Sequence, residues 1–122
     1  MRVLLVDDEV ELVSTLAERL RMRGIEADWT PSAAGALTAV KERDYAIAVL
    51  NVKLPGTTGL ELRTRLHLMC PTMKFIFVTG HGCEDAFEQG QEAAGSEYYL
   101  VKPVNIGLLV QKIHDALEQE AP

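Results

Sequence analysis

The chain has 122 residues, of which 48% are hydrophobic and 25% charged, as expected for one folded globular domain. Its 12 basic and 18 acidic residues give a net charge of −6, which argues against a broad contact with a nucleic-acid backbone. The longest apolar runs are about six residues, far below the roughly 20 that cross a bilayer, and the N-terminus lacks the apolar core of a signal peptide. We therefore expect one cytoplasmic domain over residues 1–122, with its core at about 2–119 and a tail or the start of a removed linker at 120–122. We expect no direct contact with nucleic acid or membrane.

Short apolar runs alternate with longer segments of helical period, which is typical of a parallel sheet covered by helices. Four runs are continuously apolar, as in strands buried on both faces, and they cover residues 3–6, 45–50, 75–78 and 98–101. The run at residues 25–29 instead alternates apolar and acidic residues, as in a strand at a sheet edge. The pattern predicts an α/β fold with five strands.

Five segments carry apolar residues at the three- and four-residue spacing of a helix. The first runs from Val10 to about Leu20, with Gly24 as a C-terminal cap. Thr30 and Pro31 predict the start of the second helix, with Thr30 as N-cap and Pro31 at the first helical position. The remaining three helices are predicted at residues 59–68, 84–94 and 106–117.

Polar residues follow four of the apolar runs, at the end of the sheet where open α/β proteins bind ligands. They are Asp7-Asp8-Glu9, Asn51, Thr79-Gly80-His81-Gly82 and Lys102-Pro103. Two adjacent acids, an amide, a hydroxyl and an ammonium in one crevice suit a divalent cation such as Mg²⁺ together with a phosphoryl group.

Four segments resemble, in order and spacing, the receiver domain of two-component response regulators over nearly the whole chain: VLLVDDE, N-x-K-L-P-G, VTGHG and YYLVKP. The resemblance implies a flavodoxin-like, doubly wound sheet of five parallel strands in the order 2-1-3-4-5. It also implies that a sensor histidine kinase donates a phosphoryl group to an Asp. The signal would then reach an effector domain, a partner protein or a second copy through the face made by helix four, strand five and helix five.

The resemblance further implies roles for individual residues. Asp7 and Asp8 are the metal-binding acids, and Lys53 contributes its backbone carbonyl to Mg²⁺. Thr79 is the switch hydroxyl and Tyr99 the switch aromatic side chain. Lys102 is the cation that contacts the phosphoryl group, and the peptide bond between Lys102 and Pro103 is expected to be cis.

Asn51 departs from the family pattern, because it stands where a receiver has its phosphoacceptor Asp. An Asp carboxylate attacks phosphorus and forms an acyl phosphate, whereas the amide of Asn is a very poor nucleophile. We therefore expect phosphorylation to be blocked, the inactive state to be held, and Mg²⁺ binding to weaken as three carboxylates become two. We expect an engineered Asp→Asn replacement in an otherwise ordinary receiver. The alternative is a natural pseudo-receiver that acts as a phosphorylation-independent protein-interaction module.

Two other classes of α/β protein also bind ligands after the first strand. A haloacid-dehalogenase-like phosphatase needs a second Asp two residues after its nucleophile, but Asp7 is followed at that spacing by Glu9. A flavodoxin-like cofactor binder needs a neutral, hydroxyl-rich phosphate loop, whereas the loop here is acidic. The sequence therefore favours a signalling receiver over an enzyme.

Overall fold

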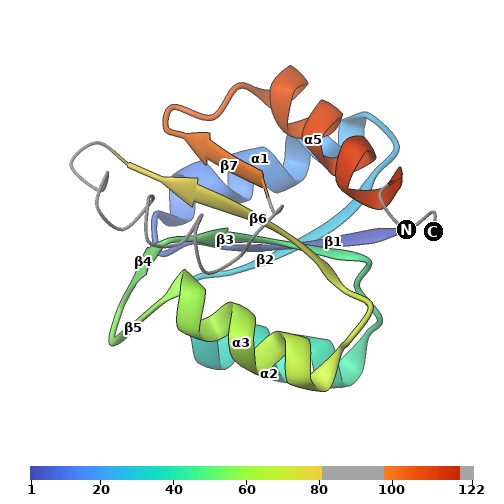
Figure 1. Ribbon diagram of the computed structural model, residues 1–122. Coiled ribbons are helices and arrows are strands. Elements are labelled where there is room, and N and C mark those ends of the chain that lie inside the picture. The colour runs from blue at the N-terminus through green and yellow to red at the C-terminus, as the bar shows by residue number, and fades with distance from the viewer. Residues whose placement is uncertain (81–97, 119–122) are drawn as a thin grey trace.

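The structure is a computed structural model that describes residues 1–80 and 98–118. Five parallel strands form its central sheet in the order β2-β1-β3-β6-β7 (Figure 1). They are β1 (Arg2–Val6), β2 (Glu26–Thr30), β3 (Ile47–Asn51), β6 (Lys74–Thr79) and β7 (Tyr98–Val101). Because β6 and β7 are the fourth and fifth strands of this sheet, the order is the predicted 2-1-3-4-5, and the order reverses between β1 and β3.

Helices cover both faces of the sheet, as Figure 1 shows. On one face lie α1 (Val10–Met22) and α5 (Ile106–Glu118), and on the other α2 (Ala33–Glu42) and α3 (Gly59–Met69). The predicted helix at residues 84–94 lies outside the described residues. None of the helices in the described part of the chain combines the length and hydropathy needed to cross a bilayer.

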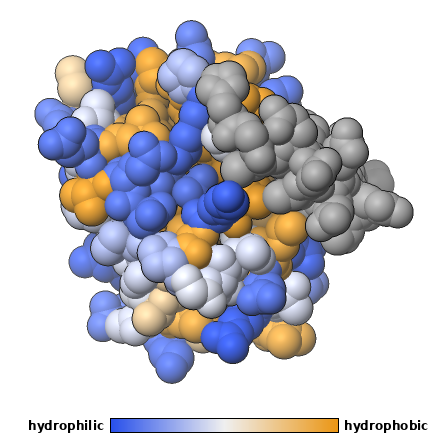
Figure 2. Space-filling view, turned by 90° about the vertical axis from the view of Figure 1, so that its left-hand side faces the viewer, coloured by the Kyte–Doolittle hydropathy of each residue, from blue (hydrophilic) through white to orange (hydrophobic). Residues whose placement is uncertain are grey.

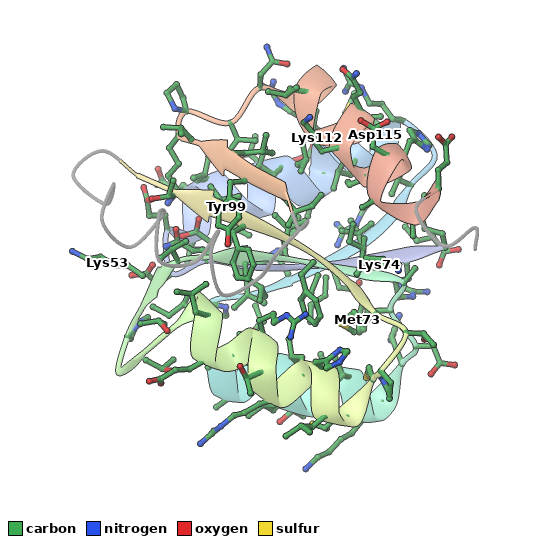
Figure 3. The ribbon with its side chains drawn as sticks, viewed as in Figure 1. Lys53, Met73, Lys74, Tyr99, Lys112 and Asp115 are labelled. Atoms are coloured by element: carbon green, nitrogen blue, oxygen red, sulfur yellow. The ribbon has the colours of Figure 1, made fainter. Side chains whose placement is uncertain are left out.

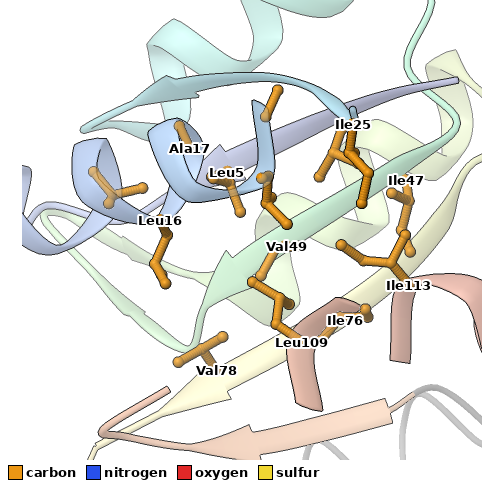
Figure 4. Packing of buried hydrophobic residues seen from close by; sticks show 14 of the residues in the cluster. Leu5, Leu16, Ala17, Ile25, Ile47, Val49, Ile76, Val78, Leu109 and Ile113 are labelled. Atoms are coloured by element: carbon orange, nitrogen blue, oxygen red, sulfur yellow. The ribbon is translucent and has the colours of Figure 1, made fainter. Parts of the chain in front are cut away.

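Two hydrophobic clusters lie on the two faces of the sheet, because successive side chains of a strand point to opposite sides. On β1, Leu5 packs in the cluster under α1 and α5, together with Ile47 and Leu109 (Figure 4). Its neighbour Leu4 packs in the cluster under α2 and α3. Both leucines are 1% exposed, so the central strands are buried on both faces as their continuous apolar runs predict.

The predicted start of the second helix at Thr30 and Pro31 is wrong. Thr30 is the last residue of β2, pairs with Val6 of β1, and accepts a hydrogen bond from the Asp7 backbone N–H at 3.2 Å. The helix begins at Ala33, because the hydroxyl of Ser32 accepts a hydrogen bond from the N–H of Gly35 at 3.1 Å. Pairing with β1 therefore keeps Thr30 extended, and the cap lies two residues further on.

The other helix ends agree with the sequence more closely. Gly24 follows α1 with a φ of +80°, a conformation that glycine adopts without strain, and its N–H donates to the carbonyl of Arg21 at 3.0 Å. Helix α3 begins at Gly59, as predicted, with Thr58 as its N-cap, and it ends at Met69, one residue beyond the predicted range. Helix α5 covers the predicted apolar stripe.

A two-stranded hairpin that was not predicted follows β3. It joins β4 (Lys53–Leu54) to β5 (Thr57–Thr58) in antiparallel pairing, and Gly56 in its turn has a φ of +74°. The Pro55-Gly56 pair is the sequence signal for this turn, because proline presets the first turn position and glycine tolerates a positive φ at the second. The hairpin lies beside the carboxyl ends of the sheet strands (Figure 1).

Candidate functional site

The polar residues predicted at the strand ends meet at one edge of the sheet. Several of them line a pocket of about 690 Å³, whereas Asp7 and Thr79 do not. Its walls are Asp8, Glu9, Asn51, Gly80, Lys102 and residues 53–58 of the hairpin. Figure 2 looks onto this end of the molecule and shows hydrophilic side chains across its middle. Parallel strands bring their carboxyl ends to the same edge, so the convergence follows from the topology.

Asn51 is the last residue of β3 and is only 7% exposed. Its side-chain Nδ2 donates a hydrogen bond of 2.6 Å to the backbone carbonyl of Lys53 and lies 3.5 Å from Oδ1 of Asp8. The Lys53 side chain points away from the sheet (Figure 3), so only its backbone faces Asn51. The first turn of α3 packs closely here, since a Cβ added to Gly59 would lie 2.4 Å from the Asn51 carbonyl oxygen.

Lys102 follows β7, and its ammonium is held by the loop after β1. Its Nζ lies 3.0 Å from Oδ2 of Asp7 and donates a short hydrogen bond to the carboxylate of Glu9. Burial lowers the pKa of Lys102, but the hydrogen bonds to Glu9 and Asp7 and the charges of these two acids outweigh it and raise the pKa above its usual value. Lys102 is therefore fully charged at neutral pH. Its peptide bond to Pro103 is cis, as predicted.

Thr79 and Tyr99 lie on the α2 and α3 face of the sheet. Thr79 is the last residue of β6 and is 4% exposed, and its carbonyl accepts a hydrogen bond of 2.8 Å from the N–H of Lys102. Tyr99 pairs with Phe77 across the two strands, and their rings stack at a centroid distance of 5.1 Å. Figure 3 shows the Tyr99 side chain directed toward the layer of α3. Tyr99 thus lies opposite Phe77, two residues before Thr79 on β6, and it does not line the pocket.

One pocket residue received no role from its sequence. Glu9 is the third acid of the Asp7-Asp8-Glu9 segment, and its carboxylate binds the Lys102 ammonium across 93 residues of sequence. The run of three acids after a buried strand is the only local signal for Glu9. The identity of its partner depends on the direction of the Lys102 side chain across the ends of β3 and β6, which the sequence pattern does not specify. His81 and Gly82 of the predicted site lie outside the described residues.

The oxygen donors at this edge are of the kind that Mg²⁺ prefers: the carboxylates of Asp7 and Asp8, the amide oxygen of Asn51 and the Lys53 carbonyl. Internal donors already engage most of them. Oδ1 of Asp7 accepts from the Glu9 N–H at 2.9 Å, its Oδ2 faces Lys102, and the Lys53 carbonyl accepts from Asn51. Within the described residues, no three His, Cys, Asp or Glu side chains are arranged as a metal site. The donor set therefore fits a hard cation in kind, and a bound cation would have to compete with these contacts.

Comparison with known proteins agrees with the fold. The family model of the response regulator receiver domain matches residues 3–114. The transcriptional regulatory protein GlrR of Escherichia coli is 32% identical over 121 residues, which are 98% of this chain and 27% of that protein. The phosphate regulon regulatory protein PhoB of Pseudomonas aeruginosa is 31% identical over 122 residues, 98% of this chain and 53% of that protein. The chain spans about a quarter to a half of the length of these relatives.

Solved structures show the same likeness. A CheY-like response regulator receiver domain protein from Methanospirillum hungatei superposes with a TM-score of 0.86 at 30% identity, over 97% of this chain and 94% of that one. The receiver domain of NtrX from Brucella abortus gives a TM-score of 0.86 at 27% identity, over 97% of this chain and 99% of that one. With its five-stranded parallel sheet, the acids after β1 and the lysine after β7, this chain belongs to the response regulator receiver family of two-component signalling.

Proposed function

We propose that this receiver is silent because Asn51 occupies the phosphoacceptor position and holds the domain in its inactive state. The observation that carries the proposal is the place of Asn51. It is the buried last residue of the central strand β3, and its side chain lies in the same pocket as Asp8 and Lys102. In a receiver, a carboxylate at this place attacks phosphorus while the donor's leaving group departs, and an acyl phosphate forms. The nitrogen electron pair of the Asn51 amide is delocalised into its carbonyl, so the amide is a very poor nucleophile for that step.

The other site residues keep the roles that the resemblance implies. Asp7, Asp8 and the Lys53 carbonyl would hold Mg²⁺, which neutralises phosphoryl charge when bound, and the neutral Asn51 weakens that binding. Lys102 would contact the phosphoryl group. Thr79 and Tyr99 would follow it as the switch hydroxyl and the switch aromatic, a pairing supported by their shared face of the sheet.

The partners proposed for this domain are those of two-component signalling. A sensor histidine kinase would be the phosphoryl donor to a chain with a competent acceptor. The relatives described above are transcriptional regulatory proteins, so we infer an effector domain or partner protein as the output. The face of β7 and α5, together with the helix predicted at residues 84–94, is proposed as the contact, also for a homodimer. Apolar exposure at Val101 (55%) and Leu108 (42%) on β7 and α5 supports this choice.

A second candidate is a natural pseudo-receiver that acts by protein contacts alone. The contacts in the pocket favour the pseudo-receiver, since the Lys102 ammonium and the Asn51 amide both bind groups of the chain itself. An engineered Asp→Asn replacement in an ordinary receiver is the first candidate. The two candidates differ in whether Asn51→Asp can take up a phosphoryl group.

The test is the intact mass of the protein after incubation with acetyl phosphate and Mg²⁺. The chain itself, Asn51→Asp and Asn51→Ala are treated side by side, with Asn51→Ala as the control that has neither an amide nor a carboxylate. We expect a single phosphoryl adduct on Asn51→Asp alone. An adduct on all three would place the acceptor elsewhere and overturn the assignment of Asn51. No adduct on any of them would overturn the silenced receiver in favour of the interaction module.

A further inference from the structure

The hairpin of β4 and β5 forms one wall of the pocket, and a side chain ties it to the first turn of α3. The hydroxyl of Thr57 donates a hydrogen bond of 2.7 Å to Oε2 of Glu61. Glu61 is the third residue of α3, and its backbone N–H donates to the hydroxyl of the N-cap Thr58 at 3.1 Å. Glu61 therefore holds both residues of β5, the strand that runs directly into α3 in Figure 1.

The direction of the Glu61 side chain departs from the usual capping pattern. In a capping box, a glutamate at the third helical position reaches back to the backbone N–H of the N-cap residue. Here Oε2 reaches one residue further, to the hydroxyl of Thr57. A hydrogen bond to an ionised carboxylate is roughly twice as strong as one between neutral groups. The Glu61 side chain thus stabilises the hairpin as well as the start of the helix.

The Lys53 carbonyl belongs to the other strand of this hairpin. Lys53 pairs with Thr58, and Leu54 pairs with Thr57. Leu54 is 8% exposed and packs in the cluster under α2 and α3, which anchors β4 on the core. A hairpin with two residue pairs has little stability of its own in water. The hydrogen bond to Glu61 therefore fixes β5 and, through the pairing, the position of the Lys53 carbonyl.

We propose that Glu61 is a positioning residue that makes this pocket prefer Mg²⁺ to Ca²⁺, because it holds the Lys53 carbonyl in place through Thr57. Mg²⁺ demands near-octahedral oxygen ligands at about 2.1 Å, whereas Ca²⁺ accepts about six to eight oxygens at about 2.3–2.6 Å in flexible geometry. A fixed hairpin favours the smaller ion, so loosening it weakens Mg²⁺ binding more than Ca²⁺ binding. The inference rests on the proposed function only in placing a divalent cation beside Asp8 and the Lys53 carbonyl.

The test is NMR titration of the full chain, Thr57→Val and Thr64→Val with Mg²⁺ and separately with Ca²⁺, followed at the backbone amide of Asp8. Thr57→Val removes the hydroxyl and leaves every charge in place. Thr64→Val is the matched control, because the Thr64 hydroxyl donates to the Leu60 carbonyl within α3 at 3.2 Å.

We expect Thr57→Val to lower the ratio of Mg²⁺ to Ca²⁺ affinity about threefold or more, and Thr64→Val to keep the ratio of the full chain. Equal ratios in the two variants would overturn the proposal. So would an Asp8 amide that responds to neither cation in the full chain.

Two substitutions of Glu61 separate its hydrogen bond from its charge. Glu61→Gln and Glu61→Ala both remove one negative charge, which weakens the binding of both divalent cations and cancels in the ratio of their affinities. The amide oxygen of Gln still accepts the Thr57 hydroxyl, so Glu61→Gln should keep the ratio of the full chain. Glu61→Ala should lower the ratio as Thr57→Val does. An equal fall in both Glu61 variants would contradict the hydrogen bond as the cause and overturn the positioning role.

These titrations use no phosphodonor and leave Asn51 in place. If Asn51→Asp fails to take up a phosphoryl group, the proposed function fails and the preference between the two cations is unaffected. If the ratio of affinities does not respond to Thr57→Val, the positioning role of Glu61 fails and the proposed function is unaffected.

Discussion

The side-chain amide of Asn51 donates a hydrogen bond of 2.6 Å to the backbone carbonyl of Lys53. A carboxylate at position 51 has no proton to donate at neutral pH, so the two oxygens would face each other unless a cation lay between them. The amide N–H therefore partners the Lys53 carbonyl, whereas an Asp at position 51 would need a bound cation between its carboxylate and that carbonyl. This relationship explains how the pocket can be stable with an uncharged residue at position 51.

Asn51→Asp should make the stability of the domain depend on Mg²⁺. Without the ion the variant should lose about 1–2 kcal/mol, because the Lys53 carbonyl loses its donor and a third carboxylate joins Asp7 and Asp8. Added Mg²⁺ should then raise its melting temperature by about 3 °C or more, since a ligand that binds only the folded state stabilises it. Thermal unfolding followed by circular dichroism measures both effects. Asn51→Ala is the control and should not gain more from Mg²⁺ than the full chain; an equal gain in both variants would count against the carboxylate as the cause.

Gly59→Ala should destabilise the domain at the pocket. An added Cβ would lie 2.4 Å from the Asn51 carbonyl oxygen, which is backbone and cannot move aside as a side-chain end could. We expect a loss of about 1–3 kcal/mol in the free energy of unfolding by urea. Gly107→Ala is the matched control, because its Cβ would meet only the side-chain oxygen of Asn105, at 3.2 Å, and alanine favours the helix. Equal losses in the two variants would refute the close packing of α3 on β3.

The pairing of Tyr45 with Asp28 should give the domain a pH-dependent stability in the alkaline range. Burial and the hydrogen bond of 2.7 Å to Asp28 raise the pKa of Tyr45 to about 12. The folded pKa is higher than the unfolded one, so the stabilisation is complete below the unfolded value of about 10 and is lost as pH rises from there through about 12.

Urea unfolding of the full chain and of Tyr45→Phe between about pH 8 and about pH 11 measures this contribution. The full chain should lose more stability than the variant over that interval, by up to about 1 kcal/mol, because only part of the titration falls below pH 11. Parallel losses in the two proteins would show that Tyr45 ionises as easily in the folded state as in the unfolded one.

The hydrophobic pattern was enough to predict the five strands. Burial of both faces was wrong for the apolar run at residues 98–101, because that strand, β7, is at an edge of the sheet and its Val101 is 55% exposed. The strand starting at Glu26 is indeed at the edge. The start of α2 was misplaced because Thr30 and Ser32 are both good N-caps, and strand pairing with Val6 decided between them.

The sequence predicted which strand-end residues gather at the candidate site. It did not predict which of their side chains contact each other. Asp8, Asn51, Lys53 and Lys102 do line one pocket. The contact between Lys102 and Glu9 depends on side-chain direction between segments 93 residues apart, which no local pattern encodes. The turn of the β4 and β5 hairpin had a sequence signal in Pro55-Gly56, but its strands of two residues are too short to show periodicity.

The site of the acyl phosphate in Asn51→Asp tests whether position 51 is the acceptor position. Borohydride reduces an aspartyl phosphate to homoserine, which peptide mass spectrometry locates to a single residue. After acetyl phosphate and Mg²⁺ treatment, we expect homoserine at position 51 of Asn51→Asp and none anywhere in the full chain. Homoserine at Asp7 or Asp8, or in the full chain itself, would contradict the assignment of position 51.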